Sequence, residues 1–252
     1  MAMVQNAMFP YFREYIRALP ENDPDELLPA APFLLEEDRG KGLQVYYTPL
    51  EYVNPEAKVI IVGITPGLHQ MKRAYATVIE TTGTDEEILR RVKQESSFHG
   101  PMRKNLVEML DALQLAHYLG IETCSQLFNT HNHLLHSTSI LPHAVFYKGR
   151  NYNGSSPGIH ANSMLKKYTE AYFPGNIEGI EETLMVPLGV NVQKVLEGLM
   201  AKGLIKEHQL LRGFPHPSGG NGHRLHQFAE NKERMRQEIE TFFCSRDEKK
   251  DR

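Results

Sequence analysis

The segment Lys58 to Ile64 contains an unbroken run of β-branched residues, VIIV, at positions 59–62. Such a run is typical of a strand that is buried on both faces of a parallel sheet, because neither face carries a polar side chain. It leads directly into a loop of glycine, threonine and proline, GITPG, which ends at Gly67. Ligands of open α/β sheets bind outside the carboxyl ends of the strands, so this loop is a first candidate for a binding site.

Strand-like and helix-like segments alternate along the chain. Apolar residues at helical spacing that end at glycine or proline predict helices, and short β-branched runs predict strands. The expected helices cover Tyr11–Leu19, Leu68–Gln94 with a break at Gly83, Met102–Leu119, Asn162–Phe173, Val190–Lys202 and Leu225–Phe243, and the further strands lie in Leu43–Thr48, Leu134–Tyr147, Thr183–Leu188 and Gln209–Phe214. This alternation favours an α/β fold with a parallel sheet and right-handed crossovers.

The composition fits one globular domain over residues 1–252. A chain of 252 residues with 40% hydrophobic content can bury one sizeable core. We expect residues 1–42 to form a helical and connecting extension, with an acidic, proline-punctuated connector at Asp23–Phe33. The charged residues 245–252 are expected to form a disordered tail.

The composition also argues against several classes of protein. The two cysteines, Cys124 and Cys244, are too few for a disulfide framework or a four-cysteine iron–sulfur cluster, which favours a reducing, cytoplasmic setting. The first residues do not read as a signal peptide, and no stretch approaches the roughly 20 apolar residues of a membrane span. A net charge of -3 argues against a strongly basic nucleic-acid coat, although it leaves room for a local basic groove.

A second loop, GFPHPSGGNGHR at 213–224, follows the last expected strand. It places His216 just after the strand, ahead of small, flexible and basic residues. Glycine amides and an arginine side chain together suit contact with a phosphate backbone, which indicates a nucleic-acid ligand. A lone histidine at a strand end is more often structural than catalytic, so the whole run carries the prediction.

Together the two loops resemble the signature motifs of the uracil-DNA glycosylase superfamily: a glycine-x-polar-proline loop after the first core strand and a His-Pro-Ser loop after the last. A third match is SSFHGPMRKNL at 96–106, similar to the family's segment with a base-stacking phenylalanine, and a weaker fourth is MVPLGVNVQKVL at 185–196. The resemblance implies a three-layer α/β/α sandwich around a central, mainly parallel sheet of about four strands. It also implies a monomeric DNA glycosylase that extrudes a base and works without metal or organic cofactor.

The resemblance carries site roles over to this chain residue by residue. His216 would stabilise the departing base, and Thr65 holds the position of the family's water-activating residue. The base-binding residues would be Ile64, Phe98, Ser139 and Asn153, and the DNA-binding residues Pro66, Gly67, Ser218, Gly219, Gly220, Asn221, His223 and Arg224.

Thr65 is the main departure from the family pattern, in which this position carries Asp, Asn or a Glu-Ala variant. A threonine hydroxyl is not a general base near neutral pH, so it could at most orient a water molecule. The usual base-reading asparagine is also absent from HSTSILPH, where Ser139 and its neighbours stand instead, although Asn129, Asn132, Asn151 or Asn153 could replace it. These departures favour a damaged or modified base other than uracil, such as a substituted cytosine.

Two segments are longer than in compact relatives: Leu68–Gln94, and Phe146–His160 with its many hydrogen-bonding groups. They indicate either a roomier pocket for a bulky base or, for Phe146–His160, an ordinary solvated and mobile loop.

Two other functions stay open. The chain could be a catalytically silent reader of modified bases, in which His216 serves recognition alone. It could also be a metal-dependent hydrolase that uses histidines such as those of HNHLLH at 131–136. A glycosylase is the prediction we adopt, in DNA repair or in defence against phage DNA.

Overall fold

The computed structural model describes residues 3–4, 7–19, 31–98, 100–206 and 209–250. The chain divides into two compact units. The first unit comprises Met1–Val53, Ile64–Ser97 and Thr138–Glu178, and the second comprises Asn54–Gly63, Phe98–Ser137 and Gly179–Arg252. Pro20 and most of the expected connector Asp23–Phe33 lie outside the described residues.

The first unit contains an antiparallel sheet. Its strand order is β1 (Leu34–Asp38), β2 (Leu43–Tyr46), β5 (Ala144–Tyr147) and β6 (Arg150–Asn151). Each neighbouring pair is antiparallel. The expected strand Leu43–Thr48 is thereby confirmed as β2, whereas β1 and β6 were not predicted, because LLEED lacks an alternating pattern and β6 has two residues.

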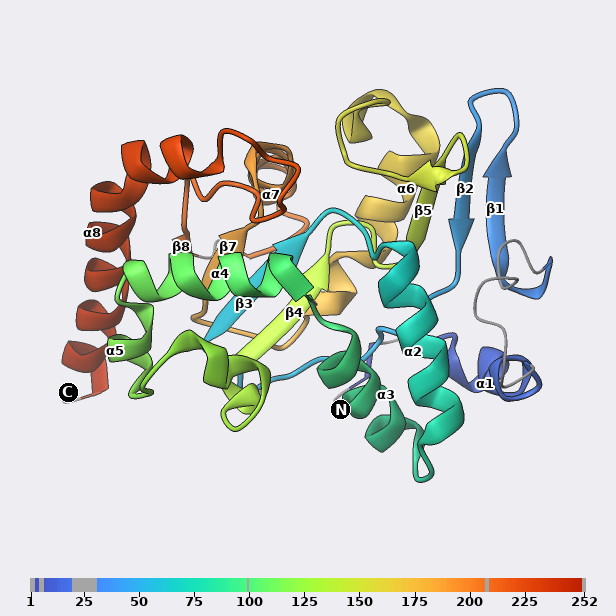
Figure 1. Ribbon diagram of the computed structural model, residues 1–252, viewed down its shortest axis with the longest axis horizontal. Helices are drawn as coiled ribbons and strands as arrows, with labels where there is room; N and C mark the ends of the chain where they lie inside the picture. The colour runs from blue at the N-terminus through green and yellow to red at the C-terminus, as the bar shows by residue number, and fades with distance from the viewer. Residues whose placement is uncertain (1–2, 5–6, 20–30, 99, 207–208, 251–252) are drawn as a thin grey trace. The chain divides into compact units, whose positions relative to one another are not determined.

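Helices of the first unit are α1 (Phe9–Arg17), α2 (Leu68–Glu80), α3 (Asp85–Ser96) and α6 (Ser163–Tyr172), with short 3-10 helices at Ala31–Phe33, Ile159–Ala161 and Pro174–Ile177. α2 and α3 pack side by side (Figure 1). The break predicted at Gly83 is confirmed, and Thr84 is the N-cap of α3, with a capping box completed by Glu87. The core of this unit includes Phe12 stacked on Tyr47, with ring centroids 4.1 Å apart.

The second unit contains the sheet with the predicted parallel strands. Its order is β4 (Leu135–Ser139), β3 (Val59–Gly63), β7 (Leu184–Pro187) and β8 (Gln209–Leu210), and both β3–β7 and β7–β8 are parallel. Every residue of β3 and β7 is buried, as the β-branched run at 59–62 predicts. The last two residues of β4 belong to the first unit.

Helices of the second unit are α4 (Gly100–Ala112), α5 (Leu115–Leu119), α7 (Val190–Ala201) and α8 (Arg224–Lys250), with 3-10 helices at Cys124–Phe128 and Asn132–Leu134. One apolar core joins residues of β3, α4, β7 and α8, including Val59, Leu106, Val186 and Ile239. No helix within the described residues is both long and apolar enough to cross a membrane.

Three predicted elements are corrected by the structure. The helix expected over Met102–Leu119 is interrupted at Gln114, whose φ of 62° is left-handed and breaks the helical path between α4 and α5. The strand expected within Leu134–Tyr147 is two strands, β4 and β5, which lie in different sheets and are separated by Pro142, a residue without a main-chain donor. The strand expected over Gln209–Phe214 ends at Leu210, shortly before the chain turns at Gly213 with a φ of 82°.

The remaining helices and strands match their predictions within a few residues at each end. α8 continues to Lys250, beyond the point at 245 where we expected the tail to begin. The single-domain boundary of 1–252 remains a prediction.

Candidate functional site

The first loop, GITPG, connects β3 to α2 in the structure, as the sequence predicts. Thr65 is half-buried, and its hydroxyl makes two strong contacts inside the first unit. Oγ1 donates to the carbonyl of His143 at 2.8 Å and accepts from the amide of Val145 at 3.0 Å. The Thr65 hydroxyl therefore fastens the first loop to the beginning of β5, which leaves one lone pair with which it could orient water.

His143 is a core residue of the first unit. It is 2% exposed, and its Nδ1 accepts from the amide of Thr48 at 3.4 Å. Burial lowers the pKa of His143 to about 4, so its ring is neutral near pH 7.

The end of the first loop is already hydrogen-bonded. Pro66 is buried, and Gly67 precedes α2 in an extended conformation. The amide of Gly67 donates to Gln70 Oε1 at 3.1 Å, and the amide of Leu68 donates to Asn151 Oδ1 at 3.0 Å. These amides, which could otherwise meet a phosphate at a helix N-terminus, are satisfied within the protein.

The enlarged segment Phe146–His160 folds against the first loop through Asn151 and Gly154. Gly154 has a φ of 80°, and a Cβ at this position would lie 2.5 Å from Cδ1 of Ile64. Asn153, a predicted base-binding residue, is exposed, and its Oδ1 accepts from the amide and the hydroxyl of Ser155 at 3.0 and 2.6 Å. The segment therefore packs directly against Ile64 at Gly154.

Ser139, the other base-binding prediction of the first unit, is half-buried at the last position of β4. The structure thus brings Ile64, Thr65 and the Asn151–Gly154 turn together in one unit. The roles predicted for Ser139 and Asn153 stay predictions.

The second loop, in the second unit, holds His216 in a defined protonation state. The amide of Ser218 donates to His216 Nδ1 at 3.2 Å, so the neutral ring carries its proton on Nε2. Burial lowers the pKa of His216, which favours this neutral form. Gly189, with a φ of 94°, lies so close that a Cβ there would be 3.2 Å from Cβ of His216.

Several side chains fasten the second loop from within the second unit. Asn105 Nδ2 donates to the carbonyl of Pro217 at 2.8 Å, Asn221 Nδ2 donates to that of His216 at 3.2 Å, and Arg224 Nη1 donates to that of Ser218 at 2.9 Å. Of the predicted DNA-binding residues, Gly219, Gly220 and His223 are exposed, whereas Ser218, Asn221 and Arg224 are half-buried. The exposed tip of the loop is therefore glycine-rich, and the half-buried Arg224 follows it.

Phe98 is 6% exposed and belongs to the apolar core of the second unit. Its φ of 40° is unusual for a bulky residue, and its carbonyl accepts from Nε of Arg103. Residues in such conformations are held there by their surroundings and are frequent at functional sites. The predicted stacking role of Phe98 stays a prediction.

The histidines of HNHLLH have structural contacts. His136 is 1% exposed and its Nδ1 accepts from the amide of Asn54 at 3.4 Å, while the rings of His131 and His133 lie 6.0 Å apart. Across the part of the chain that the structure describes, no three His, Cys, Asp or Glu side chains gather as metal ligands would.

Sequence reasoning missed the residues that hold the two loops: Asn105 and Gly189 for the second loop, and Gly154 for the first. All three lie within segments that the sequence singles out, but their partners are distant in the chain. No local pattern identifies such contacts.

The fold and the candidate site define an α/β protein in which a His-Pro-Ser loop follows the last strand of a parallel sheet. No family model matches the sequence. The chain belongs to the same family as the uncharacterized protein YoxB of Bacillus subtilis strain 168, to which it is 38% identical over 236 residues, 92% of this chain and 91% of that protein.

The chain is also similar to the crystal structure of wild-type SMUG2 from Pedobacter heparinus. The identity is 14% and the TM-score 0.42, over 98% of this chain and 100% of the other.

Proposed function

We propose that this chain is a DNA glycosylase of the uracil-DNA glycosylase type, which extrudes a damaged or modified base and hydrolyses its bond to deoxyribose. In this proposal the chain forms a three-layer α/β/α sandwich. The reaction adds water to C1′ of the sugar and releases the base, leaving an abasic site. Repair of host DNA and defence against phage DNA would both use this reaction in the cytoplasm.

The observation that carries the proposal is the tautomer of the His216 ring. Its Nδ1 is occupied by the amide of Ser218, so Nε2 is left as a neutral donor at the end of a parallel sheet. In the proposed reaction this N–H donates to the base oxygen on which negative charge develops as the bond to C1′ breaks. A preorganised donor of this kind is typically worth roughly 3 to 4 kcal/mol in the transition state.

Water activation is the weaker half of the proposed reaction. The proton of the Thr65 hydroxyl is donated to the carbonyl of His143, and the hydroxyl has no capacity to remove a proton from water near pH 7. A base that leaves readily lowers the demand on the water. This consideration supports a substituted or damaged base over plain uracil.

The proposed DNA contact is the exposed tip of the second loop. Gly219 and Gly220 allow a phosphate to approach the main chain, and Arg224 supplies positive charge. Neither contact depends on base sequence, as a protein that searches DNA for an altered base requires.

A reader of modified bases is the second candidate, and the two hydrogen bonds of Thr65 favour it. With its hydroxyl engaged, Thr65 could mark a site that binds the base and does not hydrolyse it. Formation of abasic sites separates the two candidates.

The test is incubation of the protein with duplex and single-stranded oligonucleotides that carry uracil, hypoxanthine, mismatched thymine or substituted cytosines, followed by alkaline cleavage. His216→Ala should lower the excision rate about 100- to 1,000-fold. His226→Gln is a matched control, because His226 is an exposed histidine of α8. Its Nδ1 lies 3.3 Å from Oε2 of Glu230, a residue of the same helix. Equal excision by His216→Ala and the wild type would exclude the proposed mechanism, and binding without excision would favour the reader.

A further inference from the structure

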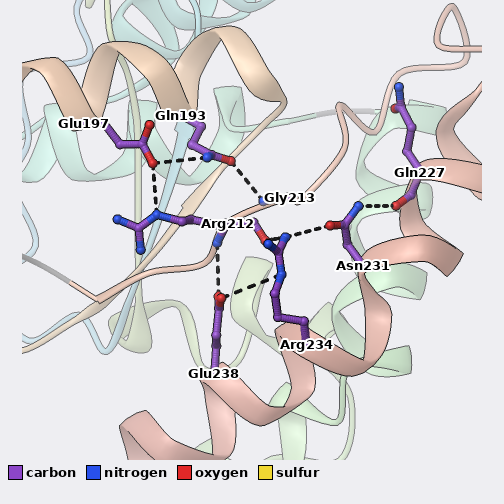
Figure 2. A network of polar contacts seen from close by, with 8 residues as sticks. All are labelled: Gln193, Glu197, Arg212, Gly213, Gln227, Asn231, Arg234 and Glu238. Carbon is purple, nitrogen blue, oxygen red and sulfur yellow. Dashed lines mark hydrogen bonds and ion pairs between the residues drawn. The ribbon is translucent and has the colours of Figure 1, made fainter.

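The approach to the second loop is fixed by side chains of α7 and α8 (Figure 2). The amide of Gly213 donates to Gln193 Oε1 at 3.0 Å, and the amide of Arg212 donates to Glu238 Oε2 at 3.2 Å. Arg234 Nη2 donates to the carbonyl of Arg212 at 3.1 Å. Both main-chain groups of Arg212 are therefore held by α8.

The same helix also holds the far side of the loop. Asn231 Oδ1 accepts from Arg234 at 2.6 Å, and Asn231 Nδ2 donates to the carbonyl of Gln227 at 2.8 Å (Figure 2). Gln227 Oε1 accepts from Asn221 Nδ2 at 3.0 Å, and the same Nδ2 donates to the carbonyl of His216 at 3.2 Å. A continuous series of hydrogen bonds thus runs from Arg212 through α8 to the main chain of His216.

Asn221 is the centre of this arrangement. Its main-chain N–H donates to the carbonyl of Ser218 at 3.1 Å, and its side-chain Oδ1 accepts from the main-chain N–H of His223 at 3.3 Å. Asn221 therefore holds the carbonyls of both His216 and Ser218, the two residues joined by the bond from the Ser218 amide to His216 Nδ1. Any rotation of the His216–Ser218 turn would break contacts of Asn221, together with those of Asn105 and Arg224.

We propose that Asn221 is a positioning residue for His216. Through its hydrogen bond to Gln227 of α8, Asn221 holds the turn that keeps the Nε2 proton of His216 in place. This inference rests on the proposed function, and it revises the role that the sequence assigns to Asn221, a direct contact with DNA. Both polar atoms of its carboxamide are occupied within the protein, so they are poorly available for a nucleic acid.

Three variants test the proposal. Asn221→Ala removes the contacts to His216 and Gln227. Gln227→Leu removes the acceptor on α8 and leaves the loop residues intact, whereas Gln227→Glu keeps an acceptor oxygen at the same place. His226→Gln, one position away on α8, is the matched control.

The first measurement uses the free protein and requires no activity. Long-range proton–nitrogen NMR spectra of the histidine rings report which nitrogen carries the proton, and His216→Gln assigns the His216 signals. The wild type, Gln227→Glu and His226→Gln should give the signals of a single Nε2-protonated ring. Asn221→Ala and Gln227→Leu should give a mixture of tautomers.

The second measurement separates catalysis from DNA binding. At saturating enzyme, the single-turnover rate constant on the best base of the oligonucleotide panel should fall about 10- to 100-fold in Asn221→Ala and Gln227→Leu. The Kd for a duplex with an abasic-site analogue should change less than threefold. A raised Kd in Asn221→Ala, with an unchanged rate constant, would show that Asn221 is a DNA contact.

The His216 signals decide the outcome. Unchanged signals in both Asn221→Ala and Gln227→Leu would overturn the proposal, whatever happens to the rate. If the wild type excises no base, the proposed function fails, but the spectra still decide whether Asn221 positions His216. If Asn221→Ala does not fold, Gln227→Leu and Gln227→Glu carry the same comparison.

Discussion

Gly154→Ala tests the packing of the enlarged segment on the first loop. The φ of 80° at Gly154 is in the left-handed region, where an alanine costs about 1 to 2 kcal/mol. The new Cβ would also lie 2.5 Å from Cδ1 and 2.9 Å from Cγ1 of Ile64, a buried side chain. Overpacking of this kind costs about 1 to 3 kcal/mol more, so the total loss in the free energy of unfolding should be about 2 to 5 kcal/mol.

Gly149→Ala is the matched control in the same segment. Gly149 has a φ of 72°, and a Cβ there would meet no atom within 4 Å. The control therefore isolates the backbone cost of about 1 to 2 kcal/mol. Urea unfolding of both variants, with the slope of the transition checked for constancy, should show a difference of about 1 to 3 kcal/mol. In the Ile64→Ala background, Gly154→Ala should cost less free energy of unfolding than it does in the wild type, because the atoms that the new Cβ would meet are absent.

Equal losses in Gly154→Ala and Gly149→Ala would refute this reasoning. They would mean that the segment yields at Gly154 without disturbing Ile64, as a mobile loop does. Such a result would contradict the packing of the enlarged segment on the first loop.

Three further outcomes concern buried polar groups. Burial lowers the pKa of Lys93 to about 7, so the unfolded chain binds more protons than the folded protein between pH 7 and 10.5. The free energy of unfolding should therefore rise over this range by at most about 5 kcal/mol. In unfolding titrations, Lys93→Met should flatten this rise. Burial lowers the pKa of His143 to about 4, so stability should fall by at most about 3 kcal/mol as the pH drops from 6.5 to 4, and less in His143→Gln. Thr65→Val should lose about 1 to 3 kcal/mol in urea unfolding, because the amide of Val145 loses its partner, whereas Thr65→Ser should stay within about 1 kcal/mol; equal losses in the two would contradict the role of the hydroxyl.

Local signals were enough to predict the parallel sheet. The runs at Val59–Gly63 and Leu184–Pro187 are β-branched or apolar throughout, and their burial on both faces follows from that composition alone. Gly120 and Gly203 end helices in left-handed conformations, which a side chain adopts only at a cost.

Long-range contacts decided the features that the sequence did not reveal. Gln114 breaks a regular helical pattern, and its side chain accepts from Arg236 of α8, a partner 122 positions away. Asn221 reads as a loop residue exposed to DNA, but its carboxamide is used by His216 and Gln227. Pattern identifies which residues lie in the second loop, and only the contacts identify which of them hold it.

Thr65 and His216 differ in one respect that bears on the chemistry. The proton of the Thr65 hydroxyl is donated to a main-chain carbonyl, whereas Nε2 of His216 keeps its proton because Nδ1 is the acceptor. In the proposed glycosylase reaction, water activation is therefore weak, and stabilisation of the departing base must supply more of the rate. It follows that excision by this chain should rise steeply with the acidity of the departing base across a series of substituted pyrimidines, and that Thr65→Ser should preserve this slope. A rate constant for bond cleavage that does not depend on the leaving base would contradict the role assigned to His216.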